Sequence, residues 1–329
     1  MSVSVGPRAS SSARARARRR NRQVDRIGDA ALYGLCLITS LLVAFALLEI
    51  AYQVVHGATA AMSRFGLAFL GHSAWKPNFN VFGAATLLYG TAVSSLMALL
   101  LATPIGIAIG LYLSLLAPRA VRGVIGPLVE MLAAVPSVIL GFWGILVLGP
   151  FVRSHLEPWL HSALGFLPVF GSPSTSGSSL FTAGLILTMM VLPIIASVSR
   201  DLFSTVPQEL QDGAAALGAT RWEVVRGVVL PSTASGVAAA ACLGLGRALG
   251  EAIAVTQVIG AGSAIHASLF ATGDTLASRI AAQFQGATTK LHTASLFYLA
   301  VVLLAIGVIT NLLAQWIARR FDQHGGLAR

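Results

Sequence analysis

Six long runs of apolar residues dominate this chain, and each is long enough to cross a lipid bilayer. A membrane-spanning helix needs about 20 predominantly apolar residues, because the hydrocarbon core is about 30 Å thick. The runs lie at residues 30–55, 83–117, 122–150, 178–200, 233–262 and 294–318. Charged residues make up only 10% of the chain, whereas soluble domains carry about 25%. The sequence therefore predicts an all-α polytopic membrane protein with six transmembrane helices.

The first apolar run follows an arginine-rich segment, a combination that also occurs in secretory signal peptides. Residues 30–55 extend well beyond the roughly 7–15 residues of a signal-peptide core, so the run predicts a retained span. Residues 1–29 hold eight arginines and no apolar face, which predicts a disordered cytoplasmic tail. We interpret this tail as a topology signal that contacts anionic lipid, rather than as a nucleic-acid site.

The positions of lysine and arginine predict the side of the membrane on which each loop lies. With the amino terminus inside, 16 basic residues lie on the inner side, 5 on the outer side, and Arg247 lies within the membrane. Because cytoplasmic loops are enriched in these residues, both termini are expected in the cytoplasm. Residues 30–320 then form the transmembrane domain, and residues 321–329 form a cytoplasmic tail.

Three segments are expected outside: 56–82, 151–177 and 263–293. The first contains Trp75, which we expect to be an anchor at the membrane interface. In the third, Leu276, Ile280 and Phe284 have helical spacing, which predicts a short helix on the outer surface.

Cofactor and nucleotide motifs are absent from the sequence. The two cysteines, Cys36 and Cys242, lie inside apolar runs, and no Cys/His metal spacing occurs. We expect neither a metal nor a cofactor. A phosphate-binding loop requires Gly-Lys-Ser/Thr, but Lys76 is followed by Pro and Lys290 by Leu. The chain is therefore not expected to be an enzyme, and no catalytic residue is assigned.

The longest inner loop, residues 199–236, has the pattern of two helices joined by a turn. Gly218 breaks the first helix, and Thr220 can cap a second helix that runs to Leu230. We expect Pro231 to end this segment before the next span begins. A compact helical pair of this kind suits docking into the groove of a partner protein, whereas an ordinary surface loop is the simpler alternative.

This loop resembles the coupling loop of ABC-importer permeases. Its pattern is Glu-Ala-Ala, three residues, Gly, nine residues, Ile, one residue and Leu-Pro. The matching residues here are Asp212, Gly213, Ala214, Gly218, Val228, Leu230 and Pro231. Every spacing fits, and the departures are Asp212, Gly213 and Val228. In that family the loop inserts into a groove on the ATP-hydrolysing subunit, so the resemblance implies that residues 201–232 couple this chain to an ATPase.

The likeness extends over residues 65–320. Four stretches, "FLGHSAWKP", "VEMLAAVPSVILGFWG", "ALGATRWEVV" and "GLGRALGEAIAVTQVIG", resemble the permeases of phosphate-specific importers, most closely the PstC type. The resemblance implies a type I ABC importer permease fold in a bacterial plasma membrane. It also implies a second permease, two ATP-binding subunits, a phosphate-binding protein outside and phosphate as substrate. Finally, it implies that Arg247 and Glu251 lie on the substrate path.

Arg247 and Glu251 are full charges inside an apolar run. Residues four apart share one face of a helix, so the two side chains are expected to touch. A charge at mid-membrane costs at least about 2.5–3.5 kcal/mol on insertion scales, and pairing lowers that cost. The pair either fixes helix packing or binds a hydrated anion. An arginine suits phosphate because its planar fork donates paired hydrogen bonds, while Glu251 would position Arg247 and weaken its grip.

Other polar residues within the spans have less specific interpretations. Glu130 is expected either to be a structural partner for a neighbouring helix or to lie on the path. Asn311 is expected to form hydrogen bonds between helices rather than to bind substrate. We expect Gly244, Gly246 and Gly250 to permit close helix approach.

Several functions remain open from the residues alone. The nearest alternatives are the partner PstA-type permease and a permease for another oxyanion, such as sulfate or molybdate. An ion-coupled secondary transporter is a different class, which the coupling loop and the small number of acids within the spans disfavour. A structural membrane scaffold would leave Arg247 unexplained.

Overall fold

The computed structural model describes the backbone of residues 11–325 and the side chains of residues 28–317. These residues are almost entirely helical and contain no β-strand, apart from an isolated bridge between Lys76 and Val81. The α-helices are α1 (Ser11–Phe65), α2 (Ala68–Gly71), α3 (Ala85–Leu111), α4 (Arg119–Ala133), α5 (Ser137–Trp143), α6 (Gly149–Phe151), α7 (Glu157–Leu164), α8 (Leu180–Ser204), α9 (Gln208–Ala216), α10 (Arg221–Val224), α11 (Leu230–Leu249), α12 (Ile253–Val258), α13 (Leu276–Gln283) and α14 (Lys290–Gly325). Shorter 3₁₀ and π turns are η1 (Pro77–Phe79), η2 (Tyr112–Leu116), η3 (Gly144–Leu148), η4 (Val152–Leu156), η5 (Pro168–Phe170) and η6 (Val225–Val229).

The chain divides into two compact units, residues 1–56 and 57–329. Most of α1 belongs to the first unit, and nearly all of its large hydrophobic side chains between Leu32 and Val55 are 45–72% exposed. A helix that is apolar on all sides fits a lipid environment. The α1 backbone is helical from Ser11 onward, through the arginine-rich residues 11–29. Alanine and arginine, which are frequent there, are both good helix formers. Residues 1–10 lie outside the described part.

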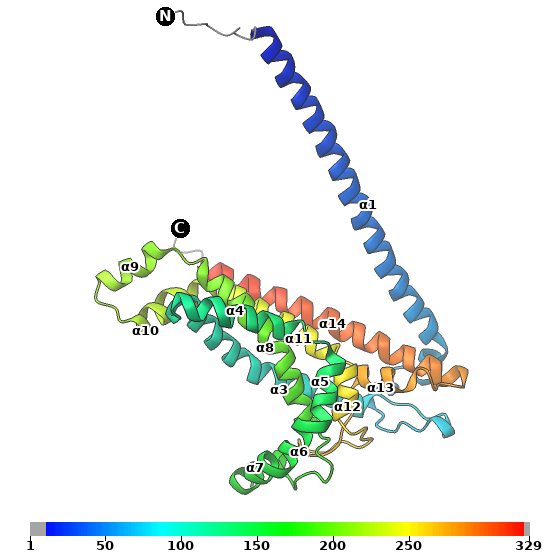
Figure 1. Ribbon diagram of the computed structural model, residues 1–329. Coiled ribbons are helices and arrows are strands. Elements are labelled where there is room, and N and C mark those ends of the chain that lie inside the picture. Colours follow the sequence, from blue (N-terminus) through cyan, green and yellow to red (C-terminus); the bar gives the residue numbers. More distant parts are fainter. Residues whose placement is uncertain (1–10, 326–329) are drawn as a thin grey trace, which may run out of the picture. The chain divides into compact units, whose positions relative to one another are not determined.

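Four long helices of the second unit, α3, α8, α11 and α14, run alongside one another (Figure 1). In the apolar 18-residue stretch of α8, 67% of the residues are buried, compared with 22–28% in the corresponding stretches of the other candidate spans of this unit. This helix is therefore the centre of the bundle. Its Ile186 and Val191 pack with Ala98 of α3 and with Val255 of α12 in the largest hydrophobic core. The α9–α10 pair lies at one end of the bundle, and α13 lies at the opposite end (Figure 1).

Six described helical segments are long and apolar enough to cross a membrane, as predicted. They are Gly28–Phe65, Ala85–Leu116, Ser137–Leu164, Leu180–Ser204, Arg221–Leu249 and Lys290–Ile317. The third span lies further along the chain than the predicted residues 122–150, at Ser137–Leu164. Helix α4 ends at Ala133, and a new helix begins after Pro136. A proline has no N–H to donate and its ring clashes with the preceding turn, so it can separate two helices.

The fifth span differs from its predicted range of 233–262. Helical structure continues from Arg221 to Leu249 through α10, η6 and α11, so Pro231 does not end the loop segment. The π-helical turn η6 ends at Val229, two residues before this proline. Such a turn shifts the hydrogen-bond register, so that the helix can accommodate a residue without an N–H. The actual interruption falls at residues 250–252, before α12.

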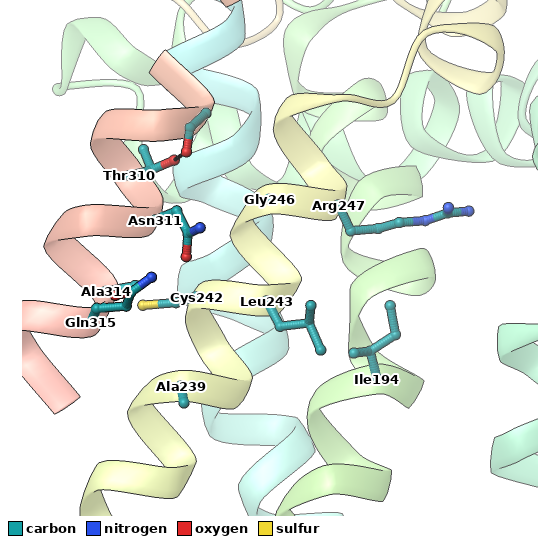
Figure 2. Close-up of a pocket in the computed structure, with 11 residues that line it drawn as sticks. Ile194, Ala239, Cys242, Leu243, Gly246, Arg247, Thr310, Asn311, Ala314 and Gln315 are labelled. Atoms are coloured by element: carbon teal, nitrogen blue, oxygen red, sulfur yellow. Dashed lines mark hydrogen bonds between the residues drawn. The ribbon is translucent and has the colours of Figure 1, made fainter. Parts of the chain in front are cut away.

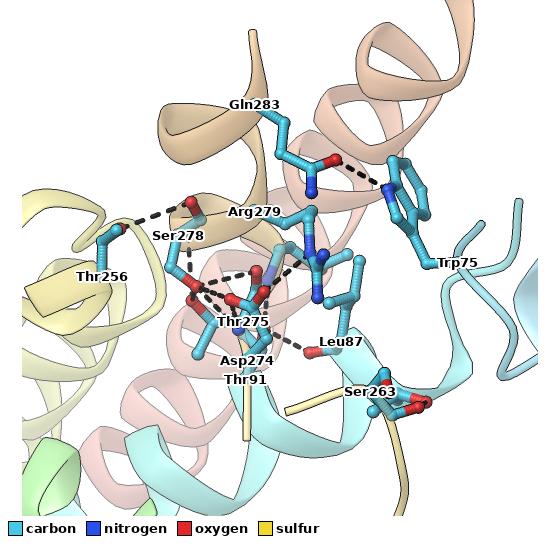
Figure 3. A network of polar contacts seen from close by, with 12 residues as sticks. Trp75, Leu87, Thr91, Thr256, Ser263, Asp274, Thr275, Ser278, Arg279 and Gln283 are labelled. Atoms are coloured by element: carbon cyan, nitrogen blue, oxygen red, sulfur yellow. Dashed lines mark hydrogen bonds and ion pairs between the residues drawn. The ribbon is translucent and has the colours of Figure 1, made fainter. Parts of the chain in front are cut away.

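The end of the bundle that holds α13 is more deeply packed than predicted (Figure 3). Trp75 is 8% exposed and donates its indole N–H to the Gln283 side-chain oxygen at 2.7 Å, so it is a core residue rather than an interfacial anchor. Helix α13 forms as predicted, but its first turn is buried instead of lying on the surface. The Leu276 N–H donates to the Thr91 hydroxyl of α3 at 2.9 Å. This bond joins α13 to the bundle.

A buried ion pair lies at the same end. The Arg279 Nε atom lies 2.6 Å from the Asp274 Oδ2 atom, and their side chains are 10% and 6% exposed. The segment before α13 approaches α3 so closely that a Cβ atom at Gly90 would lie 2.0 Å from the Asp274 carbonyl oxygen. Burial raises the pKa of the Asp274 carboxyl, while the Arg279 charge and hydrogen bonds oppose that shift. The ionised carboxylate therefore depends on Arg279.

Replacing Arg279 with Met is expected to destabilise the second unit strongly. Removal of one partner from a buried ion pair costs about 3–5 kcal/mol, because the other charge is left uncompensated. The thermal midpoint of the purified protein should fall clearly. Lys290, which is exposed, provides a matched control, and Lys290→Met should leave the midpoint nearly unchanged. Equal midpoints for the two variants would show that the ion pair does not stabilise this end of the bundle.

Candidate substrate path and coupling loop

Arg247 and Glu251 lie where helix α11 gives way to α12. Arg247 is in the last turn of α11, which ends at Leu249, and Glu251 follows in the interruption. The Arg247 Nη2 and Glu251 Oε2 atoms are 3.9 Å apart, a loose ion pair. The two side chains are in contact, as their spacing predicted, although the helix between them is broken after Leu249. A second contact holds the acid, since the Ala254 N–H donates to Glu251 Oε1 at 3.3 Å.

The two charged side chains differ sharply in exposure. Arg247 is 48% exposed, whereas Glu251 is 8% exposed. The carboxylate is thus fixed against the first turn of α12, while the guanidinium keeps free donors. An arginine has five N–H donors, and one weak ion pair leaves most of them available to an anion.

Arg247 lines a groove of about 700 Å³ over the face of α11, between α8 and α14 (Figure 2). It is the only charged residue among those that line the groove. The lining residues are Ile194, Ala239, Cys242, Leu243, Gly246, Arg247, Gly307, Thr310, Asn311, Ala314 and Gln315. Gly246 forms part of this open face and not a helix contact, because an added Cβ would meet nothing within 4 Å. At Gly244, in contrast, an added Cβ would lie 2.5 Å from Val191, as a packing glycine requires.

Asn311 does not form the interhelical hydrogen bond that we expected. Its side chain is exposed and has no hydrogen-bond partner among the described residues. It lines the groove together with Gln315, a residue that the sequence analysis did not single out. The i, i+4 spacing of these two amide residues, on the same helix face, is the signal that could have identified them.

Glu130 lies apart from the residues that line the groove. Its Oε1 atom is 2.8 Å from Arg200 Nη2, and Arg200 also contacts Asp201 at 2.9 Å. This network joins α4 to α8. The geometry fits the structural alternative for Glu130 rather than a place on the path.

Glu157 is a buried acid that the sequence analysis missed. It begins α7 within the third candidate span and is 0% exposed. Its carboxylate accepts hydrogen bonds from the Ser174 N–H at 2.6 Å and the Ser179 hydroxyl at 3.2 Å. These contacts hold the loop before α8 against α7, so the observed role of Glu157 is structural.

Residues 199–236 form the expected helical pair, α9 and α10. Gly218 lies between them with φ +91°, a conformation that favours glycine. Thr220 caps α10: its hydroxyl accepts from the Glu223 N–H at 3.4 Å, and Glu223 Oε2 accepts from the Thr220 N–H at 2.7 Å. This capping box fixes the start of the second helix.

The residues of the coupling pattern are not gathered at one point. Asp212 and Gly213 are exposed on α9, with the half-buried Ala214 beside them. Leu230 packs inward near Phe203 in a small core, and the exposed Pro231 follows it on α11. The first part of the pattern is therefore exposed on the protein surface, while Leu230 packs the loop against the bundle.

Large apolar side chains are exposed at the tip of this loop. Leu217 is 92% exposed, Trp222 is 63% exposed and Leu210 is 54% exposed. Hydrophobic residues clustered on a loop at the end of a bundle are typical of a protein–protein contact.

Comparisons with known proteins agree on one class of membrane transporter. Residues 102–323 match the family described as "Binding-protein-dependent transport system inner membrane component". The phosphate transport system permease protein PstC of Mesorhizobium japonicum is 39% identical over 302 residues, covering 91% of this chain and 92% of that protein. The protein of the same name from Pasteurella multocida is 40% identical, covering 83% and 86%. PstC 1 of Mycobacterium tuberculosis is 38% identical, covering 74% of each chain.

Solved structures share the fold at lower sequence identity. A chain of the bacterial alginate ABC transporter, in complex with an alginate-bound periplasmic protein, superposes with a TM-score of 0.59 at 19% identity. The match covers 90% of this chain and 97% of that chain. A chain of the methionine transporter MetNI, in an inward-facing conformation, gives a TM-score of 0.50 at 20% identity. At these identities the likeness concerns the fold alone.

Proposed function

We propose that this chain, which belongs to the family of binding-protein-dependent transport system inner membrane components, is a permease subunit of an ABC importer for inorganic phosphate. The observation that carries the proposal is the half-exposed Arg247 in a groove between membrane-spanning helices. A lone guanidinium on an otherwise uncharged face suits a passing oxyanion. The names of the relatives favour phosphate and the PstC type over a PstA-type subunit or another oxyanion.

In this proposal Arg247 binds phosphate, and Glu251 limits the strength of that binding. The guanidinium can donate two parallel hydrogen bonds to one phosphate group. Glu251 is held by the Ala254 N–H, so its charge stays close to the bound anion and repels it. A carrier must release its substrate, and a nearby fixed carboxylate favours release.

The energy would come from other subunits. We infer that this chain pairs with a second permease, two cytoplasmic ATP-binding subunits and an extracytoplasmic phosphate-binding protein. The α9–α10 loop supports the ATPase contact, because its exposed Leu217 and Trp222 offer an apolar surface beside Asp212. The chain itself would hydrolyse no ATP. Motion of the ATPases would pass through this loop into α11, with which α10 is continuous.

A self-contained ion-coupled transporter is the competing class. It would need acids within the membrane that can exchange protons. Among the described residues, Glu157 is the most buried acid, but loop hydrogen bonds occupy both of its oxygens. The exposed α9–α10 loop has no role in that mechanism, so the importer accounts for more of the molecule.

We propose that both termini face the cytoplasm of a bacterial inner membrane, together with the α9–α10 loop. Single cysteines at Phe79, Phe166 and Leu217 test this orientation, because these side chains are 77%, 78% and 92% exposed. In intact cells a membrane-impermeant thiol reagent should label positions 79 and 166 but not 217. Permeabilised cells serve as the control, in which position 217 should also react. Labelling of 217 before permeabilisation would reverse the proposed topology.

The substrate is tested by competition in cells. A strain that lacks its own phosphate permeases should regain uptake of labelled phosphate when it expresses this chain with its partner subunits. Excess unlabelled phosphate should abolish that uptake, and excess sulfate or molybdate should not. Uptake of labelled sulfate or molybdate, without uptake of phosphate, would assign the importer to another oxyanion.

A further inference from the structure

Two amide side chains of α14 line the same groove as Arg247. Asn311 and Gln315 are four residues apart and therefore lie on one face of the helix, about 6 Å apart along its axis. Figure 2 shows both side chains directed toward α11, with Asn311 near the level of Gly246 and Gln315 near the level of Cys242. Arg247 extends from the other side of α11, toward α8.

Neither amide is satisfied within the described residues. Both side chains are exposed, and neither forms a hydrogen bond there. The neighbouring Thr310 behaves differently, because its hydroxyl donates to the carbonyl oxygens of Ile306 at 2.9 Å and Gly307 at 3.0 Å. Hydrocarbon cannot satisfy a carboxamide, so a lipid-covered face would not carry two of them. Something that forms hydrogen bonds must occupy this side of the groove.

The groove has the charge and the space for an anion. Arg247 is its only charged lining residue, and the amide groups add neutral N–H donors. An added Cβ at either Gly246 or Gly307 would meet nothing within 4 Å, so the region between Arg247 and α14 is open. Two glycines without packing neighbours fit a passage better than a helix contact.

We propose that Asn311 and Gln315 form a second site for the translocated oxyanion, which phosphate occupies after leaving Arg247 on its way toward the cytoplasm. This inference rests on the proposed function. The amide N–H groups donate hydrogen bonds to the anion, but they carry no charge. They therefore bind it more weakly than the guanidinium, and the anion moves inward without a deep energy minimum. Gln315 lies one helical turn closer to the cytoplasmic end of α14 than Asn311, so the pair extends along the direction of import.

The test removes the amides without changing the shape of α14. The complete importer is reconstituted with Asn311→Leu, Gln315→Met or the double variant, and uptake of labelled phosphate is measured over a range of concentrations. We expect at least about a tenfold loss of the maximal uptake rate in the double variant, since hydrogen bonds to a charged ligand are lost. Asn311→Asp, which places a negative charge on the path, should reduce uptake further. Thr310→Val is the matched control and should transport normally, because its hydroxyl already bonds to the helix backbone.

Two outcomes would overturn the inference. If the double variant transported phosphate like Thr310→Val, the amides would have no part in the path. If it failed to co-purify with the second permease, the amides would serve a subunit contact instead. A wild-type complex without any phosphate uptake would refute the proposed function itself, and this inference with it. The wild-type and Arg247→Gln complexes in the same assay therefore separate the two failures.

Cys242 provides a second readout that does not depend on the α14 variants. It lines the groove opposite Gln315, and Cys36→Ser would leave it as the single cysteine of the chain. In the assembled complex, a water-soluble thiol reagent should modify Cys242, and inorganic phosphate should slow that reaction. A Cys242 that reacts in the isolated chain but not in the assembled complex would show that protein fills the groove, which would contradict the proposal.

Discussion

Replacing Arg247 with Gln is expected to abolish phosphate uptake while the complex still assembles. The substitution keeps much of the side-chain length but removes the charge and the paired donors. A hydrogen bond to a charged group contributes about 1.5–3 kcal/mol, so loss of one corresponds to roughly a 10- to 100-fold loss of binding. Because the guanidinium can donate two such bonds, its removal should cause a larger loss of phosphate binding. The measurement is labelled phosphate uptake, with co-purification of the ATPase as the check on assembly.

The double variant Arg247→Gln with Glu251→Gln decides between the two interpretations of the pair. If the pair only fixed helix packing, two neutral amides could restore a hydrogen bond and recover uptake. The structure disfavours that interpretation, because the two side chains approach only to 3.9 Å and Arg247 remains 48% exposed. We therefore expect the double variant to remain inactive at normal membrane levels. Recovery of phosphate uptake would mean that the charge serves the fold.

Gly218→Val is expected to uncouple the ATPase from transport without unfolding the spans. Gly218 has φ +91°, which a β-branched residue adopts only with strain. The turn between α9 and α10 should rearrange, and the exposed Leu217 beside it should move. Uptake should fall to background, and the ATP-binding subunit should co-purify poorly. Asp212→Lys tests the same surface by reversing a charge on α9.

Gly213 offers a matched control for Gly218. It lies inside α9, and an added Cβ would meet nothing within 4 Å. Gly213→Ala should therefore preserve transport and stabilise the helix by about 1 kcal/mol. Normal uptake in all three variants, Gly218→Val, Asp212→Lys and Gly213→Ala, would show that this loop does not couple the chain to an ATPase.

The number of spans could be predicted from the sequence, because apolar length is a local property. Their boundaries could not, because tertiary context decides how a proline is accommodated. Pro136 separates α4 from α5, whereas Pro231 lies within continuous helix after the π turn η6. Periodicity predicted α13, but long-range contacts determine its burial. These contacts include the bond from the Leu276 N–H to Thr91 of α3.

Parts of the candidate site were also predictable, because they depend on local chemistry. The positive φ of Gly218 and the cap at Thr220 follow from local chemistry, and both are present. The contact of Arg247 with Glu251 followed from their spacing, but the interruption at residues 250–252 did not. The place of Asn311 and Gln315 beside α11 depends on how α14 packs, which no short motif encodes. Glu157 was missed because its span lies further along the chain than predicted.

The most direct test of the account is ATP-driven phosphate uptake by the reconstituted importer. Proteoliposomes would contain the second permease, the ATP-binding subunits and the phosphate-binding protein, either with this chain or without it. We predict that labelled phosphate accumulates only when this chain and ATP are both present, and that accumulation stops when Arg247 is replaced by Gln. Equal accumulation without this chain, or accumulation that persists in the Arg247→Gln complex, would contradict the account.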